Sequence, residues 1–524
     1  MKRRDFLKNV GMITGAGAVS LSIGGIPMKA FAKPFMNIQS TNGKILILIQ
    51  LKGGNDGINT VIPLDQYSAY ANYRPTIKIL DTSVVKLTDA TGLHPALQQF
   101  QTLYSEGKLT LVQNVGYASP NRSHFRATDI WLSASDSNQY LYDGWVARYL
   151  LKTFPTFPGT PPTHPMGIQL ISVPSGLFDS NDGGLAVNFN DPNAFYTLVN
   201  GLTADNDPSP ATIAGDELKF LKEVAALSMQ YAGVIKEKAD KGNPTSTYPT
   251  SRLGPQLKIV ADLILGGLET PVYLTQLDGF DTHSNQLTTQ QTLFQNLADS
   301  VVAFQRDIEK AGLADKVVIM TFSEFGRRVK ENASVGTDHG AALPLFVIGK
   351  SVQGGIIGAN ANLSSLDGNG DIKFAYDYRQ IYTSILKDHF GMTTVEVKDI
   401  LLKDFTTLPI LKPTTDIHDY DSVPTEFSLA QNYPNPFNPA TTIQYTIPAR
   451  VKEPVPSSFR DETANVTLKV YDVLGNEIAT LVDQSQHAGK YQVRFDGSRL
   501  ASGTYIYTLR TNSYTQTKKM LLVK

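Results

Sequence analysis

Short apolar runs alternate with longer stretches of helical periodicity over most of the chain, and this alternation constrains the fold more than any other feature. The runs are mostly apolar, which is typical of strands buried on both faces of a sheet. They occupy residues 45–51, 110–115, 167–173, 272–277, 317–322 and 345–348. Helical spacing of apolar residues occurs at 94–106, 215–238, 256–268, 290–311 and 378–390. This order predicts an α/β domain with a mainly parallel sheet flanked by helices.

Carboxylate and imidazole side chains stand just after several predicted strands. Ligands of parallel sheets bind at the carboxyl ends of the strands, so these side chains are expected to share one crevice. Carboxylate oxygen and imidazole nitrogen bind zinc as well as hard divalent cations. The pattern therefore predicts a site for divalent metal ions, either zinc, calcium or magnesium. The predicted ligands are Asp56, Asp281, His283, Asp338 and His339, with Glu324 as a further ligand or an acid/base.

Basic side chains lie among the same segments. Arg122 and Arg327 are predicted to bind anionic oxygens of a substrate. Two metal ions about 3.5–4 Å apart would suit in-line displacement at phosphorus or sulfur. His124 is interpreted either as a metal ligand or as a donor behind one.

The composition narrows the chemistry further. The 524 residues include no cysteine, which excludes disulfides, cysteine metal sites, iron–sulfur clusters and a cysteine nucleophile. Lys and Arg number 47 against 48 Asp and Glu, a net charge of −1, so no basic field favours nucleic acid. No stretch has the ~20 strongly apolar residues that a stable membrane span needs.

The two ends of the chain differ in character from the predicted α/β domain, residues 39–411. Residues 1–32 carry paired arginines, a weakly apolar run and a small-residue cleavage site, and they resemble a twin-arginine signal peptide. Residues 412–425 are polar and bounded by proline, as a linker is. Residues 426–524 alternate apolar and polar positions between Gly and Asn turns, which predicts a β-sandwich of about seven strands.

The last block resembles the C-terminal sorting domain of the type IX secretion system. The resemblance is carried by the segment Tyr433–Pro439, by the Gly-x-Tyr strand at Gly503 and by the final Lys-Lys strand. It implies the twin-arginine and type IX export machinery as partners, and a secreted or cell-surface protein that passes through the periplasm. An immunoglobulin-like spacer without a sorting role is the alternative.

The first block resembles the exported family known as domain of unknown function 1501, which is related to the alkaline phosphatase and sulfatase superfamily. The segments that carry the resemblance are Gly53–Thr60, Leu93–Pro95, Asn121–Phe125, Asp281–Gln286, Ser323–Arg327 and Gly336–Gly340. The resemblance implies an alkaline-phosphatase-like fold, Ser123 as the nucleophile, and metal-dependent hydrolysis of a small phosphate or sulfate ester. The chain departs from the superfamily at two points. His389, in an apolar helix pattern, does not match the final His ligand, and Ala118 stands where a formylglycine sulfatase needs Cys or Ser.

Each of these interpretations has a structural alternative. The acidic residues could form turns, and Ser123 could be a helix N-cap. His94 stands before a proline at a predicted helix start, so a structural role is favoured for it, and a packing role is favoured for Trp131 and Trp145. At the level of the whole protein, the alternative is a non-catalytic surface protein that binds a glycan or an envelope component.

Overall fold

The computed structural model divides the chain into two compact units, residues 1–413 and 414–524, and each is described by itself. The described residues are 43–155, 157, 161–180, 183–200, 230–412, 427–448, 464–486, 489–511 and 514–524. The predicted signal peptide and nearly all of the predicted linker lie outside these residues. Within them, every helix is too short or too polar to cross a membrane.

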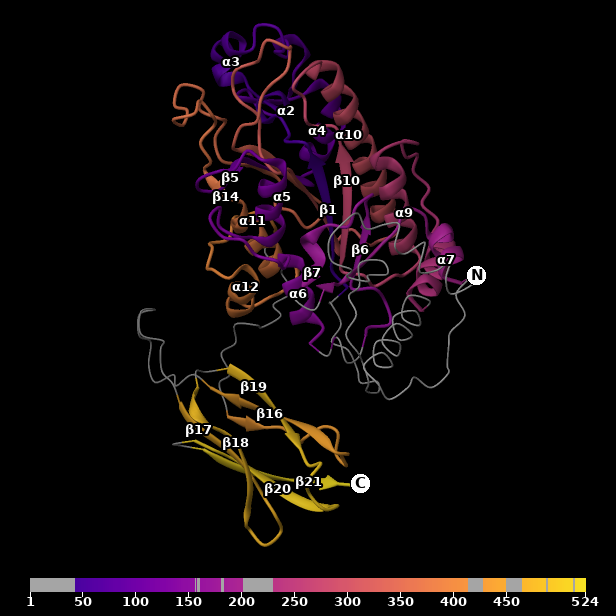
Figure 1. The fold of residues 1–524 in the computed structure, drawn as a ribbon, viewed down its shortest axis with the longest axis vertical. Coiled ribbons are helices and arrows are strands. Elements are labelled where there is room, and N and C mark those ends of the chain that lie inside the picture. The colour runs from indigo at the N-terminus through magenta and orange to yellow at the C-terminus, as the bar shows by residue number, and fades with distance from the viewer. Residues whose placement is uncertain are drawn as a thin grey trace, which may run out of the picture. The chain divides into compact units, whose positions relative to one another are not determined.

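The first unit is built on a nine-stranded sheet (Figure 1). Its strands, in spatial order, are β13 (Gly355–Ile357), β5 (Leu109–Gly116), β12 (Leu343–Ile348), β11 (Val317–Phe322), β1 (Ile45–Lys52), β10 (Val272–Asp278), β6 (Gly167–Leu170) and β9 (Ala186–Asn188), with β14 (Tyr376–Asp377) also paired to β5. All pairings are parallel except the two made by β12. Each of the six predicted runs contributes a strand, so the predicted mainly parallel sheet is confirmed.

Strand β12 runs antiparallel because no helix lies between it and β11. The segment from Ser323 to Ala342 leaves the end of β11 and enters β12 at the same edge of the sheet. A parallel connection would need a crossover that returns the chain to the opposite edge. The connecting segment therefore stays at the edge where the parallel strands end.

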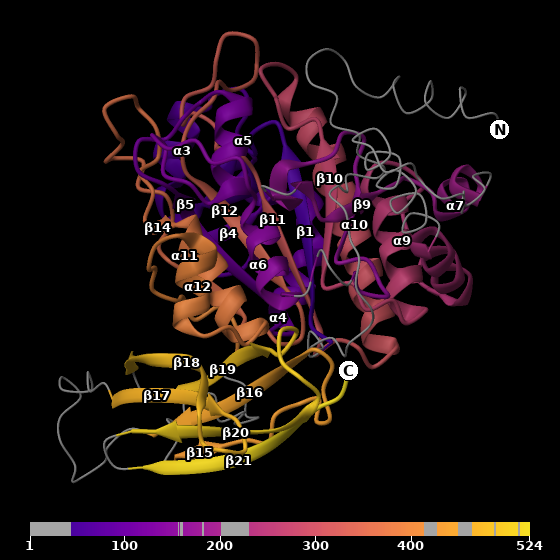
Figure 2. The ribbon, with the colours of Figure 1, turned by 60° about the horizontal axis from the view of Figure 1, so that its bottom comes forward.

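Helices cover both faces of the sheet (Figures 1 and 2). One core packs Ile47 and Ile49 of β1 against α4 (Gln98–Ser105), α9 (Leu253–Leu265) and α10 (Gln286–Lys310). Leu46 and Leu48 point to the other core. That core contains α5 (His124–Ser133), α6 (Trp145–Thr153), α11 (Tyr378–Ser384) and α12 (Thr394–Leu401). Since successive side chains of a strand alternate between faces, an uninterrupted apolar run supplies both cores.

The predicted helices agree with the structure where it describes them. The pattern at 94–106 forms a 3₁₀ turn (Pro95–Leu97) and α4, and the pattern at 378–390 forms α11 and a π-helical turn (Ile385–His389). Of the pattern at 215–238, residues 230–238 are helical and the rest lie outside the described residues. The remaining short elements are α2 (Gly57–Thr60), β2 (Val61–Pro63), α3 (Tyr67–Tyr73), β3 (Val85–Lys86), β4 (Thr91–Leu93), β7 (Asp179–Ser180), β8 (Gly183–Gly184), α7 (Pro192–Asn200) and the 3₁₀ turns Leu64–Gln66, Asp81–Ser83 and Gly176–Phe178.

The second unit is a β-sandwich, as predicted. One sheet consists of β15 (Ser428–Leu429), β16 (Ala440–Ile447) and β19 (Gly489–Asp496). The other consists of β18 (Glu477–Gln486), β17 (Ala464–Tyr471), β20 (Gly503–Arg510) and β21 (Thr515–Leu522). Alternate residues of both sheets, among them Ile443 and Leu468, form a single buried core. This alternation explains the period of two in the sequence.

Candidate metal centre

The polar segments that follow the strands meet at one edge of the sheet. The loops after β1, β10 and β11, the segment before β12, and the start of α5 after β5 all contribute side chains there. Glycines allow the loops to approach one another closely. A Cβ on Gly53 would lie 2.2 Å from the backbone nitrogen of Asp281, and one on Gly336 would lie 2.3 Å from the carbonyl carbon of His283. The glycines of these motifs are therefore required by backbone contact.

Three histidines direct their Nε2 atoms at the carboxylate of Asp281. The Nε2 atoms of His283 and His339 lie 3.1 and 3.2 Å from Oδ1, and the Nε2 atom of His124 lies 3.5 Å from Oδ2. The Nε2 atoms of His283 and His339 are also 3.0 Å apart. The four groups come from three different segments of the chain, so the fold alone brings them together.

The other ring nitrogen of each histidine is held by an acceptor. Nδ1 of His339 lies 2.8 Å from the backbone carbonyl oxygen of Arg122, and Nδ1 of His283 lies 3.2 Å from Oδ1 of Asp338. A carbonyl oxygen accepts only, so Nδ1 of His339 carries the proton of the neutral ring. The ionised Asp338 carboxylate also accepts only, so Nδ1 of His283 donates to it.

His124 is held by a buried carboxylate in the same way. Its Nδ1 lies 2.9 Å from Oε1 of Glu324, which also accepts a hydrogen bond of 2.8 Å from the backbone N–H of Gly53. Glu324 is almost completely buried, and its hydrogen bond is the main cause that raises the pKa of His124. Burial lowers the pKa of His339, although its bond to Arg122 opposes this shift.

Asp281 stays ionised in this environment. Burial favours its neutral form, but the Arg327 guanidinium, 2.5 Å from Oδ1, more than offsets this effect and lowers the pKa of the carboxyl group. The pKa of Asp338 is also lowered, chiefly by the hydrogen bond from Asn332. The centre therefore combines ionised carboxylates with imidazole lone pairs.

His124, Asp281 and His339 offer ligand atoms that all lie within 4.8 Å of one another. His283 adds a fourth donor beside Asp281 and His339. Nitrogen and oxygen donors of this kind fit zinc, and imidazoles oriented by carboxylate or carbonyl acceptors are typical of metal ligands. Asp281 and His283 are exposed, so the centre opens to solvent.

Asp56, also predicted as a ligand, has other partners. It is completely buried, and both its oxygens accept hydrogen bonds from the guanidinium of Arg74. Gln286 also donates to its Oδ2 atom. A carboxylate with this set of donors is already neutralised, so its role is structural. The chain position of Arg74, on the C-terminal side of α3, carried no signal of this pairing.

Arg327, predicted to bind anionic oxygens of a substrate, has its hydrogen bonds within the fold. It is buried, and its guanidinium donates to the backbone oxygens of Gly54, Thr337 and Phe280 and to Asp281. It therefore holds the loops of the centre together. The Arg122 guanidinium pairs with the buried Asp371, with a Nε–Oδ2 distance of 2.9 Å, and keeps 29% of its side chain exposed.

Ser123 is exposed at the N-terminus of α5, directly before His124. It occupies the N-cap position, but its hydroxyl makes no capping hydrogen bond. Glu324 lies behind His124 and contacts the centre through that ring. The contribution of the Arg122 carbonyl was not foreseen, because a backbone acceptor has no signature in sequence.

The structural interpretations of the other aromatic residues are confirmed. His94 is buried, and its Nδ1 accepts a hydrogen bond from the N–H of Ala96 at a helix start. His389 is buried with its Nε2 3.0 Å from the carbonyl oxygen of Ile45. Trp131 and Trp145 are buried and stack on tyrosines of α11.

Comparison with protein families supports both resemblances. Residues 265–400 match the family described as protein of unknown function (DUF1501), and this segment contains Asp281, His283 and His339. Residues 431–524 match the family described as secretion system C-terminal sorting domain. No curated protein matches the chain.

Comparison with solved structures gives distant similarities. The chain is similar to the alkaline phosphatase from the Antarctic bacterium TAB5 (10% identity, 67% of this chain and 99% of that chain, TM-score 0.29). It is also similar to the PsFucS1 sulfatase from Pseudoalteromonas sp. (10% identity, 87% of this chain and 84% of that chain, TM-score 0.29). A third similar structure is the lipoteichoic acid synthase LtaP from Listeria monocytogenes (10% identity, 68% of this chain and 76% of that chain, TM-score 0.30). At TM-scores this low, none of the three bears on the chemistry of the centre.

Proposed function

We propose that the α/β domain is a metal-dependent hydrolase of phosphate or sulfate esters. One observation carries the proposal: the Nε2 atoms of His283 and His339 lie 3.0 Å apart and both face the ionised Asp281. Two imidazole nitrogens and a carboxylate thus converge on the same space. Donors that lie this close together suit a single divalent cation held between them.

The ligands proposed for the ion are His124, Asp281, His283 and His339. Bound there, a divalent ion would act as a Lewis acid toward an oxygen of the ester. Asp338 and Glu324 position His283 and His124 through their Nδ1 atoms, and Arg327 keeps Asp281 ionised and oriented. Because Asp56 is neutralised within the fold, one ion is proposed instead of two.

Ser123 is the proposed nucleophile. Its exposed hydroxyl precedes the ligand His124 and is not engaged in capping α5. Its oxygen would form a bond to phosphorus or sulfur as the bond from that atom to the ester oxygen breaks, and the alcohol would leave. The hydroxyl proton passes to solvent, and the departing alkoxide takes one up. Water would then attack phosphorus or sulfur, break its bond to the serine oxygen, release phosphate or sulfate, and restore the hydroxyl with a proton. Arg122, whose side chain is partly exposed, is the proposed contact for the anionic oxygens.

Export to the cell surface is proposed from the sorting-domain match. The type IX machinery would recognise residues 431–524, and the twin-arginine machinery would recognise the N-terminal segment. The route through the periplasm belongs to the same proposal.

The test starts with metal analysis of the purified mature protein, followed by a panel of aryl phosphate and sulfate esters. We expect about one zinc or other divalent ion per chain, and loss of both metal and turnover in Asp281→Asn and His339→Ala. Glu324→Gln should weaken metal binding about 10- to 100-fold in a chelator competition, because it acts through His124.

His389→Gln is the matched control, since this histidine is buried away from the centre. It should retain metal and turnover. Metal binding without turnover of any ester would favour the non-catalytic surface protein. A purified protein that binds no divalent ion would contradict the proposal.

A further inference from the structure

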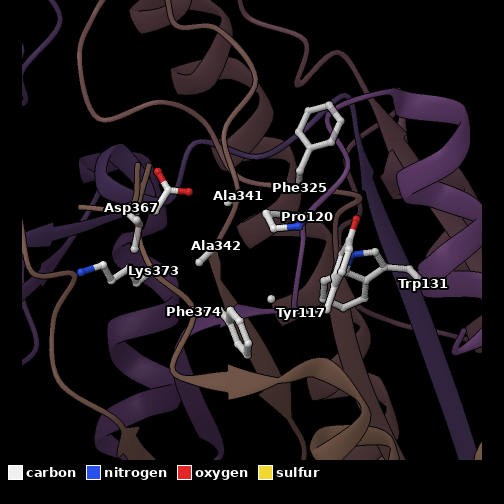
Figure 3. Close-up of a pocket in the computed structure, with 11 residues that line it drawn as sticks. Tyr117, Pro120, Trp131, Phe325, Ala341, Ala342, Asp367, Lys373 and Phe374 are labelled. Atoms are coloured by element: carbon white, nitrogen blue, oxygen red, sulfur yellow. The ribbon is translucent and has the colours of Figure 1, made fainter. Parts of the chain in front are cut away.

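A cavity of about 330 Å³ is lined by Phe325, a residue that packs against two histidines of the metal centre (Figure 3). Phe325 belongs to both: it lines the cavity, and its ring centroid lies 4.6 Å from that of His339 and 4.9 Å from that of His124. Figure 3 shows its ring directed away from Tyr117 and Phe374, which line the cavity on the other side. Phe325 therefore separates the cavity from His124 and His339.

The lining is mostly apolar. Tyr117 and Trp131 lie opposite Ala342 and Phe374 in Figure 3. Asp367 also lines the cavity, and its Oδ1 atom accepts a hydrogen bond from the backbone N–H of Asn369 at 2.8 Å. Lys373 also lines it, but its ammonium donates to Ser365 Oγ at 3.0 Å and points away from the rings in Figure 3. A ligand that fills this space would find few hydrogen-bond partners.

The walls are fixed by contacts outside the cavity. The Trp131 ring stacks on Tyr378 with centroids 4.5 Å apart, and the Tyr378 hydroxyl donates to the carbonyl oxygen of Ile130 at 2.8 Å. Asp371 precedes the lining residue Ile372 and accepts a hydrogen bond from the Arg122 guanidinium, and the Arg122 carbonyl oxygen lies 2.8 Å from Nδ1 of His339. Arg122 thus connects the segment beside the cavity to the metal centre. A pocket whose walls are already in place loses little conformational entropy when a ligand binds.

We propose that the cavity binds the apolar, ring-containing part of the ester, with the anionic end at the metal centre. The inference rests on the proposed function and names its substrate class. A cavity of ~150 Å³ holds benzene, so about twice that volume fits two fused rings. A sugar is disfavoured, because its hydroxyls would lose their hydrogen bonds to water without replacement.

The two tryptophans of the chain provide a direct test of occupancy. Trp131 lines the cavity, and Trp145 does not. Trp145→Phe keeps a ring stacked on Tyr382 and leaves Trp131 as the one fluorophore of its kind. The probe is 4-nitro-1-naphthol, a nitroaromatic quencher without an ester, compared with methyl phosphate. We expect saturable quenching by the naphthol and none by methyl phosphate.

Two substitutions of the cavity wall are made in the Trp145→Phe background. Phe374→Ala removes a ring that is 41% exposed, so the fold should tolerate it, and about a tenfold weaker affinity for the naphthol is expected. Ala342→Leu fills the cavity and should abolish saturable quenching. Tyr142→Ala is the matched control, since this exposed aromatic residue does not line the cavity.

The outcomes separate this inference from the proposed function. Saturable quenching that Phe374→Ala weakens and Tyr142→Ala leaves unchanged supports the cavity, even where no ester is hydrolysed. Hydrolysis of naphthyl esters without saturable quenching overturns the inference and leaves the proposed function standing. Equal affinities of Phe374→Ala and its parent overturn it as well.

Discussion

The two domains differ in what they bury. The α/β domain encloses charged side chains, among them Asp56, Arg74, Glu324 and Arg327. Among the described side chains of residues 427–524, the buried polar ones are uncharged, namely Asn432, Thr441 and Gln486. Both domains nevertheless have continuous apolar cores. The sandwich is thus ordered by apolar packing with uncharged buried polar groups, whereas the α/β domain also buries charged groups, and Glu324 and Arg327 are the ones that contact the candidate centre.

Burial of a charge is costly unless it is paired, so this difference has a consequence for function. Arg327 contacts the loops that carry His283 and His339, and Glu324 joins His124 to the loop that contains Gly53. Their hydrogen bonds fix loop positions that apolar packing would leave adjustable. In the described part of residues 427–524, order follows from strand pairing and the apolar core.

The largest expected effect comes from breaking a buried pair. Arg74→Leu leaves the Asp56 carboxylate without its guanidinium inside the α/β domain. We expect a loss of about 3–5 kcal/mol of unfolding free energy, since one uncompensated charge remains buried. Denaturant unfolding of the full chain would measure it.

The exposed pair of Lys469 and Glu477 in the sandwich is the matched control. Lys469→Met should leave the midpoint of unfolding unchanged, because solvent screens this pair. Equal effects of the two substitutions would contradict the proposed difference between the domains.

A smaller effect is expected from pH. Burial lowers the pKa of His94 to about 4 and that of His389 to about 3. The unfolded chain binds these protons near pH 6.5, so each residue costs about 1.4 kcal/mol per pH unit as the pH falls from 6.5 toward the folded value. Stability of the α/β domain should thus decrease on acidification.

Calorimetry of the full chain at pH 7 and pH 5 would measure this loss. His389→Gln keeps an N–H donor for the Ile45 carbonyl and should reduce the loss by about 2 kcal/mol. The unfolding free energy of the sandwich should fall less between pH 7 and pH 5, because residues 426–524 contain one histidine, His487. An unchanged pH dependence in His389→Gln would show that this histidine is not the cause.

The smallest effect concerns a glycine of each domain. Gly475 has a φ of +86° in a turn of the sandwich with open space around it, so Gly475→Ala should cost about 1–2 kcal/mol from backbone strain alone. Gly53 has a φ of +122°, and an added Cβ would strike Asp281. Gly53→Ala should therefore also reduce metal binding, as metal analysis would show. Retained metal in this variant would contradict the close packing of the two loops.

Much of the fold could be predicted from periodicity. Runs such as 45–51 became strands because a strand buried on both faces must be apolar at every position. The alternation in Val466–Val470 predicted a strand with one buried face, which β17 has. The antiparallel direction of β12 was not predictable, since its apolar run is the same for either direction.

The site was predictable in part. Asp281 and His283 follow a strand, and His339 precedes one. Because these strand ends lie at the same edge of the sheet, the three side chains meet there. Asp56 and Arg327 also follow strands, but their side chains are buried. Asp56 accepts hydrogen bonds from Arg74, and Arg327 donates to backbone carbonyl oxygens. A side chain's partners depend on distant segments, and the sequence position of the residue does not reveal them.

The order of residues by itself determined the two-domain plan and the strands and helices, because local propensity and apolar period act over a few neighbouring residues. It also placed acidic and imidazole groups beside the strand ends, but the sheet brings these segments together. Tertiary structure alone decided which donors face one another, which are neutralised, and that Phe325 separates two of them from a mostly apolar cavity. These depend on contacts between residues separated by hundreds of positions, such as Glu324 with His124.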